Sequence, residues 1–309
     1  MSSLFELEQK VLLYNPSADI AFLRKAYNFA ENAHKGQKRI SGEDYIVHPL
    51  AISIILAELQ LDLQTVAAGL LHDVVEDTGI TLADIESSFG PEVANMVDGV
   101  TKLGKLQFQT KEERQAENLR KMFLAMAKDI RVILIKLADR LHNLRTLQFQ
   151  SERKQKEVAE ETLVFFAPLA HRLGIYKIKW ELEDLSFRYR EPEQYQRMKV
   201  QIAKSRGKRE EYIQEVIKEL AEKLTVVNIK AEIQGRPKNL YSIYQKMMEQ
   251  QKELKDIFDV QAVRVLVGSV KDCYGALVLL TPCGNLYPVV LKIILPCPNP
   301  ICINPCIPQ

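Results

Sequence analysis

Apolar residues recur every three to four positions along most of residues 1–224, and this spacing predicts a chain built mainly of amphipathic helices. Ile20, Leu23, Tyr27 and Ala30, for example, fall on one helical face. The same periodicity predicts helices over residues 19–34, 49–60, 63–77, 112–128, 130–147, 154–173 and 175–190. The charged, weakly amphipathic stretch 193–224 is predicted to form a connecting helix.

The periodicity changes after residue 224. Residues 225–233 and 258–267 are rich in β-branched residues and predict strands, and residues 239–253 between them predict a helix. A strand, a helix and a second strand are typical of the start of an α+β domain. The fold class is therefore mainly α, with a helical domain at 1–190, a connecting region at 191–224 and a partial α+β domain at 225–277.

The length of the chain and its net charge limit the number of domains and the classes of partner that we expect. A chain of 309 residues favours two domains. Its 42 Lys and Arg residues against 40 Asp and Glu residues give no support for binding to nucleic acid or to a membrane surface. The first ten residues are mixed and acidic, unlike a signal peptide, and no membrane-spanning run precedes the far C-terminus, so we expect a cytoplasmic protein.

Residues 278–309 differ in composition from the rest of the chain. They hold seven of the thirteen prolines, four of the five cysteines and a single charged residue, Lys292. The cysteines lack the paired C-x-x-C spacing of a zinc site, and nothing indicates an oxidising compartment that would favour disulfides. We expect this tail to be poorly ordered or loosely packed.

The segment His72-Asp73-Val-Val-Glu76-Asp77 carries the strongest chemical signal. It places one imidazole and three carboxylates at the end of a predicted helix, and the carboxylates repel one another unless a cation lies among them. The alternative is a solvated acidic helix end. Carboxylates at a helix C-terminus oppose the helix dipole, which favours the metal site.

A second polar segment supports that interpretation. Lys136, Asp139, Asn143 and Thr146 share one face of the helix predicted over 130–147, where a stripe made for solvent would be rich in Glu and Lys. His48 precedes the predicted helix 49–60, and by itself it would be a capping or core histidine.

Together these segments offer two imidazoles and two carboxylates as ligands. A mixed nitrogen and oxygen set without thiolate suits Mn²⁺ or a similar divalent ion better than structural zinc. Glu76 and Asp77 lie one turn beyond His72 and Asp73, where they can orient or deprotonate a water molecule. This combination predicts metal-assisted hydrolysis of a phosphoester.

At this point the chain resembles a known family. His48, the His72-Asp73 pair and Asp139 match the ligand order of the HD phosphohydrolase superfamily. GLLHDVVEDT at 69–78, VDGVTKL at 97–103, KLADRLHN at 136–143 and APLAHRLG at 167–174 resemble the long bifunctional RelA/SpoT family, whose members make and destroy the alarmone (p)ppGpp. The resemblance implies an HD-type hydrolase domain followed by a nucleotidyltransferase-like synthetase domain.

The resemblance also implies roles for individual residues. The first domain would remove the 3′-pyrophosphate of (p)ppGpp with Mn²⁺, giving GDP or GTP and pyrophosphate. The implied metal ligands are His48, His72, Asp73 and Asp139, and the residues that serve the attacking water are Glu76 and Asp77. The nucleotide would be held by Arg39, Ser41, Asn143 and Thr146, to which we add Lys136 on the same face.

Some residues near these motifs have plainer interpretations. Arg39 taken alone could be a solvated arginine in a basic run, although a guanidinium can also stack on guanine or grip phosphate. His34, His142 and His171 are expected to be structural or to support the ligands. Asp44 replaces a proline that is usual in the family, which bears on the rigidity of this loop.

The second domain resembles only part of a synthetase. GRPKNLYSIYQK at 235–246 is similar to its opening, where Arg236 and Lys238 would contact ATP phosphates and Asp259 would bind Mg²⁺. As local patterns such basic loops are usually solvated. The resemblance stops after Leu277, before the family's guanine-stacking tyrosine and its second acidic metal ligand.

A shifted reading frame can explain the tail. Suitable codons for residues 291–307, shifted by one base, read FKDYIAMPKPNMYQSLH, which is similar to the missing family segment. We therefore hypothesise that residues from about 278 are read out of frame, which the nucleotide sequence can test.

Three functions follow from these patterns. The leading one is a Mn²⁺-dependent (p)ppGpp hydrolase. The second is a pyrophosphokinase that makes (p)ppGpp, which needs residues that we do not find here. The third is a non-catalytic nucleotide sensor in the second domain. No contact with nucleic acid, membrane or, without regulatory C-terminal domains, the ribosome is expected.

Overall fold

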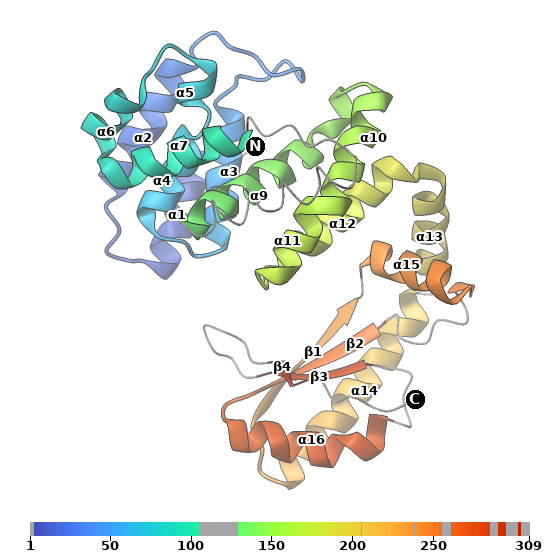
Figure 1. Cartoon of the computed structure of the whole chain (residues 1–309). Coiled ribbons are helices and arrows are strands. Elements are labelled where there is room, and N and C mark those ends of the chain that lie inside the picture. Colours follow the sequence, from blue (N-terminus) through green and yellow to red (C-terminus); the bar gives the residue numbers. More distant parts are fainter. Residues whose placement is uncertain are drawn as a thin grey trace. The chain divides into compact units, whose positions relative to one another are not determined.

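The structure, a computed structural model, describes residues 3–104, 129–204, 206–237, 239–251, 253–254, 261–284, 290–294 and 302–303. The chain divides into two compact units, Met1–Arg190 and Glu191–Gln309, which are described separately. The fold is mainly helical, with one small sheet in the second unit (Figure 1). The helix predicted over 112–128 lies outside the described residues.

Apart from an isolated bridge between Lys38 and Asp44, the regular elements described in the first unit are all helices (Figure 1). Its α-helices are α1 (Leu4–Tyr14), α2 (Ile20–Ala33), α3 (Val47–Glu58), α4 (Leu63–Leu71), α5 (Val74–Asp77), α6 (Leu82–Phe89), α7 (Pro91–Gly104), α9 (Ile130–Arg145), α10 (Glu152–Glu161), α11 (Ala167–Arg172) and α12 (Tyr176–Arg190). A short 3-10 helix, η1 (Leu147–Phe149), and a π-helix, η2 (Thr162–Phe166), complete it.

Helix α3 lies at the centre of the first unit. Every residue from His48 to Ala57 is buried, because the helix is apolar on nearly all sides and packs against α1, α4 and α9. A helix with this composition has no face suited to solvent. His48, the second residue of this helix, is therefore held in the interior.

Gly69 allows α3 and α4 to approach closely. A Cβ atom at this position would lie 2.6 Å from Cδ1 of Leu56 and 2.9 Å from Oγ of Ser53, both on α3. These distances are shorter than real Cβ contacts, so only glycine fits without displacement. The close packing sets the distance between the start of α3 and the end of α4.

The single helix predicted over 63–77 is two helices in the structure. It divides into α4 and α5, and His72 and Asp73 lie at the junction. Nδ1 of His72 hydrogen-bonds to the carbonyl of Gly69 at 2.9 Å, the acceptor that the Asp73 N–H would use in a continuous helix. His72 and Asp73 therefore lie at a break between two helices, and the four polar side chains do not crowd one helix C-terminus.

The helix predicted over 154–173 is also interrupted. The chain passes from α10 through the π-helix η2 into α11. Pro168, near the start of α11, has no N–H to donate to the preceding turn, and a widened turn accommodates this loss.

The second unit combines helices with a four-stranded sheet. Its helices are α13 (Pro192–Lys204), α14 (Arg206–Val226), α15 (Leu240–Gln250) and α16 (Val270–Gly284). Its strands are β1 (Ala231–Pro237), β2 (Gln261–Val267), β3 (Val290–Ile294) and β4 (Cys302–Ile303), in the order β1-β2-β3-β4. β2 pairs antiparallel with β1 and parallel with β3, and helix α16 connects the parallel pair.

The strand predicted over 225–233 is wrong in its first half. Helix α14 continues to Val226, and β1 begins only at Ala231. Leu224 is buried in the core of the unit, and the Thr225 hydroxyl donates to the Ala221 carbonyl. These contacts extend the helix into two exposed residues of high strand propensity, Thr225 and Val226. The helix ends near Asn228, whose positive φ of 58° is typical of a helix C-terminus.

Part of the tail belongs to the sheet. The expectation of a poorly ordered tail is corrected for residues 290–294, which pair with β2 from Ala262 to Leu266. The domain boundary expected at 277/278 falls inside α16. Cys297 and Cys306 lie outside the described residues, and the side chains of Cys283 and Cys302 are not described.

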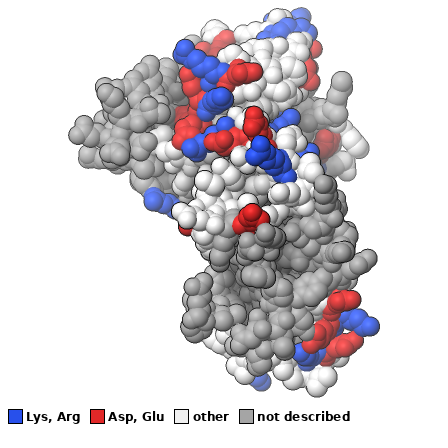
Figure 2. Space-filling model, turned by 90° about the vertical axis from the view of Figure 1, so that its right-hand side faces the viewer, with Lys and Arg blue, Asp and Glu red and all other residues white. Residues whose placement is uncertain are grey.

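The surface charge and the lengths of the helices relate to two partners considered above, nucleic acid and membranes. On the face shown in Figure 2, basic and acidic side chains of the described residues are interspersed, as the net charge of +2 leads one to expect. The described residues on that face form no broad patch of one sign. Among the residues that the structure describes, no helix combines the length and the apolar character needed to cross a bilayer.

Candidate metal centre and pocket

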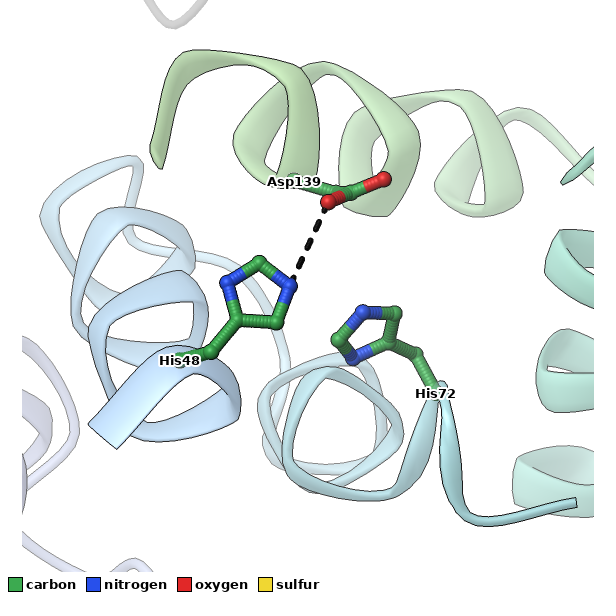
Figure 3. Close-up of side chains that lie close together, drawn as sticks. All are labelled: His48, His72 and Asp139. Atoms are coloured by element: carbon green, nitrogen blue, oxygen red, sulfur yellow. Dashed lines mark ion pairs between the residues drawn. The ribbon is translucent and has the colours of Figure 1, made fainter. Parts of the chain in front are cut away.

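Three buried side chains from separate helices meet in the first unit. His48 comes from α3, His72 follows α4, and Asp139 comes from α9 (Figure 3). Their exposed fractions are 3%, 1% and 6%. One ligand atom from each lies within 4.8 Å of the others, and Nε2 of His48 is 3.4 Å from Oδ1 of Asp139.

Asp73 adds a second carboxylate to this cluster. Its Oδ2 lies 2.9 Å from Nε2 of His72 and 3.5 Å from Nε2 of His48. All four ligands expected from the sequence are thus brought together, although they come from three separate segments of the chain. The break between α4 and α5 turns His72 and Asp73 toward the same point.

The donor atoms around His72 fit a bound cation. Because its Nδ1 donates to the Gly69 carbonyl, a neutral His72 presents a lone pair at Nε2. Among the residues that the structure describes, this buried nitrogen has no hydrogen-bond partner, and it faces a carboxylate oxygen of Asp73. Two lone pairs at 2.9 Å repel one another, so a proton or a metal ion must supply positive charge. Nitrogen and oxygen donors without sulfur suit a divalent ion of the Mn²⁺ type.

The electrostatics of the cluster favour positive charge in the same way. Burial alone would lower the pKa of His72, but Asp73 and Asp139 outweigh it and the pKa is raised. Burial would raise the pKa of Asp139, but Lys136, His48 and His72 outweigh it and hold the pKa far below its usual value. His72 and His48 likewise outweigh the effect of burial on Asp73 and hold its pKa well below its usual value, so both carboxylates remain ionised.

A pocket of about 560 Å³ opens above the cluster. Its volume lies in the range usual for small-ligand sites. Apart from His72, which is too deeply buried to line it, every residue that the sequence assigned to hydrolysis borders this pocket. These residues are Arg39, Ser41, His48, Asp73, Glu76, Asp77, Lys136, Asp139, Asn143 and Thr146.

A chain of polar contacts links the rim of the pocket to the cluster. Nη2 of Arg39 donates to Oδ1 of Asn143 and to Oγ1 of Thr146, both at 3.3 Å. Asn143 in turn donates to Oδ1 of Asp139 at 2.6 Å, and Lys136 donates to Oδ2 of Asp139 at 2.8 Å. The polar face of α9 thus contacts the pocket and not bulk solvent.

The loop before α3 forms the other side of the pocket rim. Ser41 donates to Glu43, and Lys38 forms an ion pair with Asp44 at 2.6 Å and a backbone bridge with the same residue. These contacts tie the two sides of the loop together where Asp44 replaces the proline usual in the family.

Tyr45 is a site residue that the sequence analysis did not identify. Its hydroxyl lies 2.9 Å from Oδ2 of Asp73 and 2.6 Å from Oδ2 of Asp77, and its ring stacks on His34. Burial and the two carboxylates raise its pKa above the usual range. Its place three residues before His48 was the available signal, but a tyrosine in a loop has many plainer roles.

The three histidines expected to be structural or to support the ligands differ in their surroundings. His34 supports Tyr45, and exposed His171 lies against Tyr176 outside the pocket. His142 is buried, with its Nδ1 only 2.8 Å from Nδ1 of His48. Burial, together with His48 and Arg39, lowers the pKa of His142 to about 3.

The residues expected to serve nucleotide binding in the second unit cannot be placed in the same way. Arg236 belongs to β1, but its side chain is not described. Lys238 and Asp259 lie outside the described residues.

Comparison with known families gives two matches. Residues 26–176 match the HD domain, and residues 235–292 match a region found in RelA / SpoT proteins. The second match corrects the expectation that the resemblance ends at Leu277. It extends through α16 into β3, which agrees with the position of β3 in the sheet.

Individual relatives are similar over most of this chain. The bifunctional (p)ppGpp synthase/hydrolase SpoT of Escherichia coli K12 is 50% identical over 275 residues, covering 89% of this chain and 39% of that protein. A probable guanosine-3′,5′-bis(diphosphate) 3′-pyrophosphohydrolase of Synechocystis is 52% identical over 254 residues, covering 82% and 33%. A GTP pyrophosphokinase of Myxococcus xanthus is 46% identical over 290 residues, covering 93% and 38%.

One solved structure and the lengths of the relatives complete the comparison. The structure, described as a metazoan ortholog of SpoT that hydrolyses ppGpp and plays a role in starvation responses, is 29% identical with a TM-score of 0.41. The match covers 55% of this chain and 96% of the chain in that structure.

This chain spans between 33% and 39% of the length of the three relatives above. Because one chain carries both regions and shares about half of its residues with these relatives, it belongs to the RelA/SpoT family.

Proposed function

We propose that the first unit hydrolyses (p)ppGpp, releasing pyrophosphate from the 3′ position and leaving GDP or GTP. The observation that carries this proposal is the buried cluster of His48, His72 and Asp139 directly below a polar pocket. Relatives with about 50% identity bear the name of this pyrophosphohydrolase, which supports the same reaction.

In this proposal His48, His72, Asp73 and Asp139 hold Mn²⁺. The bound ion would supply Lewis acidity, which polarises a phosphoryl oxygen and makes a water molecule more acidic. The unpartnered lone pair of buried His72 and the two ionised carboxylates, of which Asp139 is buried and Asp73 half-buried, fit this role because all three can donate electron pairs to a cation.

Glu76 and Asp77 would hold the attacking water and accept its proton. Both line the pocket and belong to α5, the single turn that follows Asp73. Their carboxylates are exposed, so they can exchange the proton with solvent after each reaction. The water oxygen joins the pyrophosphate, and the 3′-oxygen of the nucleoside leaves with a proton, so the atoms balance.

The nucleotide would lie along the polar face of α9. Arg39, Asn143 and Thr146 are already joined by hydrogen bonds and form a preorganised wall. Ser41 and Lys136 add a hydroxyl and an ammonium group to the pocket, while Lys38 and Lys154 add positive charge at its edge. Such a set suits a ligand with several phosphate groups.

The test is release of pyrophosphate from ppGpp by the purified chain, with Mn²⁺ and with a chelator. We expect release that the chelator abolishes, and we expect Asp73→Asn and Glu76→Gln to abolish release while the circular dichroism spectrum stays unchanged. Unaltered release by Asp73→Asn would contradict the metal assignment, and release in excess chelator would contradict metal dependence.

The second unit suggests a second activity, since relatives include proteins named GTP pyrophosphokinase. We propose that this chain does not synthesise (p)ppGpp, and that residues 225–277 retain at most nucleotide binding through Arg236, Lys238 and Asp259 with Mg²⁺. Formation of ppGpp from ATP and GDP by this chain would contradict the proposal. Nucleotide binding without turnover would support a sensing role.

The hypothesis of a shifted reading frame is now confined to residues beyond 292, because the family match reaches that position. It remains a prediction that the nucleotide sequence tests. If no single-base shift restores the family pattern after residue 292, the hypothesis fails.

A further inference from the structure

His48 has two functional contacts, one through each ring nitrogen. Nε2 faces the carboxylates of Asp73 and Asp139 at 3.5 and 3.4 Å, and Nδ1 lies 2.8 Å from Nδ1 of His142. Both histidines are buried, with exposed fractions of 3% and 8%. The imidazole is therefore held between the cluster on one side and a second histidine on the other.

The contact between the two Nδ1 atoms requires one shared proton. If His48 donates, its proton is on Nδ1 and its Nε2 presents a lone pair to the cluster. If His142 donates, His48 carries its proton on Nε2, and that N–H points at the place where a metal ion would bind. Only the first arrangement makes His48 a ligand.

His72 shows how the same requirement is met elsewhere in the cluster. Its Nδ1 faces the carbonyl of Gly69, which can only accept a hydrogen bond. The backbone therefore sets the tautomer of His72 without ambiguity. At Nδ1 of His48 the described part of the chain offers no such carbonyl, and the partner there is an imidazole nitrogen that can either donate or accept.

We propose that His142 is the positioning residue that accepts a hydrogen bond from His48 and thereby sets the tautomer in which His48 binds metal. This proposal deepens the proposed function and rests on it for the identity of the ion. His142 itself then carries its proton on Nε2. Groups of this kind, which orient a ligand without touching the metal, usually change metal affinity about 10- to 100-fold when they are removed.

Two substitutions separate the acceptor from the shape of the side chain. His142→Asn places a carbonyl oxygen where Nδ1 of His142 lies, whereas His142→Leu places a methyl group there. His171→Leu is the matched control, because His171 is exposed and lies outside the pocket.

The first measurement is Mn²⁺ binding to the full chain without nucleotide, followed by the electron paramagnetic resonance signal of free Mn²⁺. We expect His142→Leu to weaken binding about 10- to 100-fold, and we expect His142→Asn and His171→Leu to stay close to the unsubstituted protein. Equal weakening by the Asn and Leu variants, or unchanged binding by the Leu variant, would overturn the proposal.

The second measurement does not depend on the variants folding. The chain has five histidines, so ¹⁵N-labelled imidazoles can be resolved by long-range proton–nitrogen correlation in the unsubstituted, metal-free protein at pH 8. Through-bond correlations from each imidazole to its own backbone assign the signals in this unsubstituted protein. We expect His48 protonated on Nδ1 and His142 protonated on Nε2, and a His48 proton on Nε2 would overturn the proposal.

The two measurements also distinguish this proposal from the proposed function. If the protein binds no Mn²⁺ while His48 carries its proton on Nδ1, the metal hydrolase fails and the role of His142 in setting the tautomer stands. If Mn²⁺ binds and drives hydrolysis while His142→Leu binds it equally well, the hydrolase stands and the role of His142 fails.

Discussion

The hydroxyl of Tyr45 lies 2.6 Å from Oδ2 of Asp77. The Tyr45 hydroxyl also lies 2.9 Å from Oδ2 of Asp73. One phenol therefore connects an expected metal ligand, Asp73, to Asp77, which is expected to serve the attacking water. A phenol has a single proton and cannot donate to both carboxylates at once. Positive charge at the cluster would draw Asp73 inward and leave Tyr45 to orient Asp77.

Tyr45→Phe is expected to reduce the rate of pyrophosphate release about 10- to 100-fold, the usual effect of losing a group that orients a metal site. The loss should appear mainly in kcat, because Tyr45 holds the reacting groups. Steady-state kinetics with ppGpp and Mn²⁺ measure this. Tyr14→Phe is the control, since the Tyr14 hydroxyl donates only to the Leu61 carbonyl, away from the pocket. Equal losses in both variants would refute the role of Tyr45.

Mn²⁺ is expected to raise the melting temperature of the protein. An ion that binds only the folded state stabilises it by about 2.7 kcal/mol at a free concentration one hundred times the Kd. Asp139→Asn should abolish this increase, because it removes a charge from the buried cluster. Differential scanning calorimetry with and without chelator measures the shift. An equal Mn²⁺-dependent increase in this variant would argue against Asp139 as a ligand.

Arg39→Ala is expected to raise KM for ppGpp with a smaller effect on kcat. The guanidinium forms part of the pocket wall with Asn143 and Thr146, but it does not reach the metal cluster. Arg153→Ala serves as control, since Arg153 pairs only with Glu157 on the exposed side of α10. A change in Mn²⁺ affinity with an unchanged KM would place Arg39 in a different role.

Gly69→Ala is expected to destabilise the first unit by about 1 to 3 kcal/mol, the usual cost of overpacking a core. The new methyl group would meet Leu56 and Ser53 on α3 at distances below 3 Å. Gly79→Ala is the matched control, because nothing lies within 4 Å of a Cβ atom there. Urea unfolding of both variants tests this, and similar midpoints would show that α3 and α4 can separate without loss.

Asp129→Asn is expected to cost stability at neutral pH and little at low pH. The Arg131 guanidinium, against the opposing effect of burial, lowers the pKa of Asp129 below its usual value of about 3.9. A carboxylate with a lowered folded-state pKa stabilises the protein above its unfolded pKa, and this contribution is lost as the pH falls through its folded pKa. Asparagine keeps the helix cap of α9 but not the charge.

Thermal unfolding of both proteins at pH 7 and at pH 3 measures this difference. The gap between their melting temperatures should shrink at the lower pH. A gap that stays constant would mean that the Asp129 charge contributes nothing to stability.

Much of the helical unit follows from periodicity, and the exceptions have physical causes. The polar residues of α9 could be placed on one face because a regular helix fixes their directions. The division of 63–77 could not be foreseen, because it depends on the His72 imidazole bonding to the Gly69 carbonyl. The helix continues through the exposed residues Thr225 and Val226 because Leu224 before them is buried in the core of the second unit, and local propensity does not contain that packing.

Local sequence was enough to name the donor atoms of the cluster, since imidazoles and carboxylates without thiolates already favour a hard divalent ion. It could not reveal the partners of those atoms. Two such partners come from distant parts of the chain. Tyr45 contacts Asp77, and His142 contacts His48. Such contacts arise only when apolar helices such as α3 and α9 pack together, because burial brings the polar groups at their ends to one point.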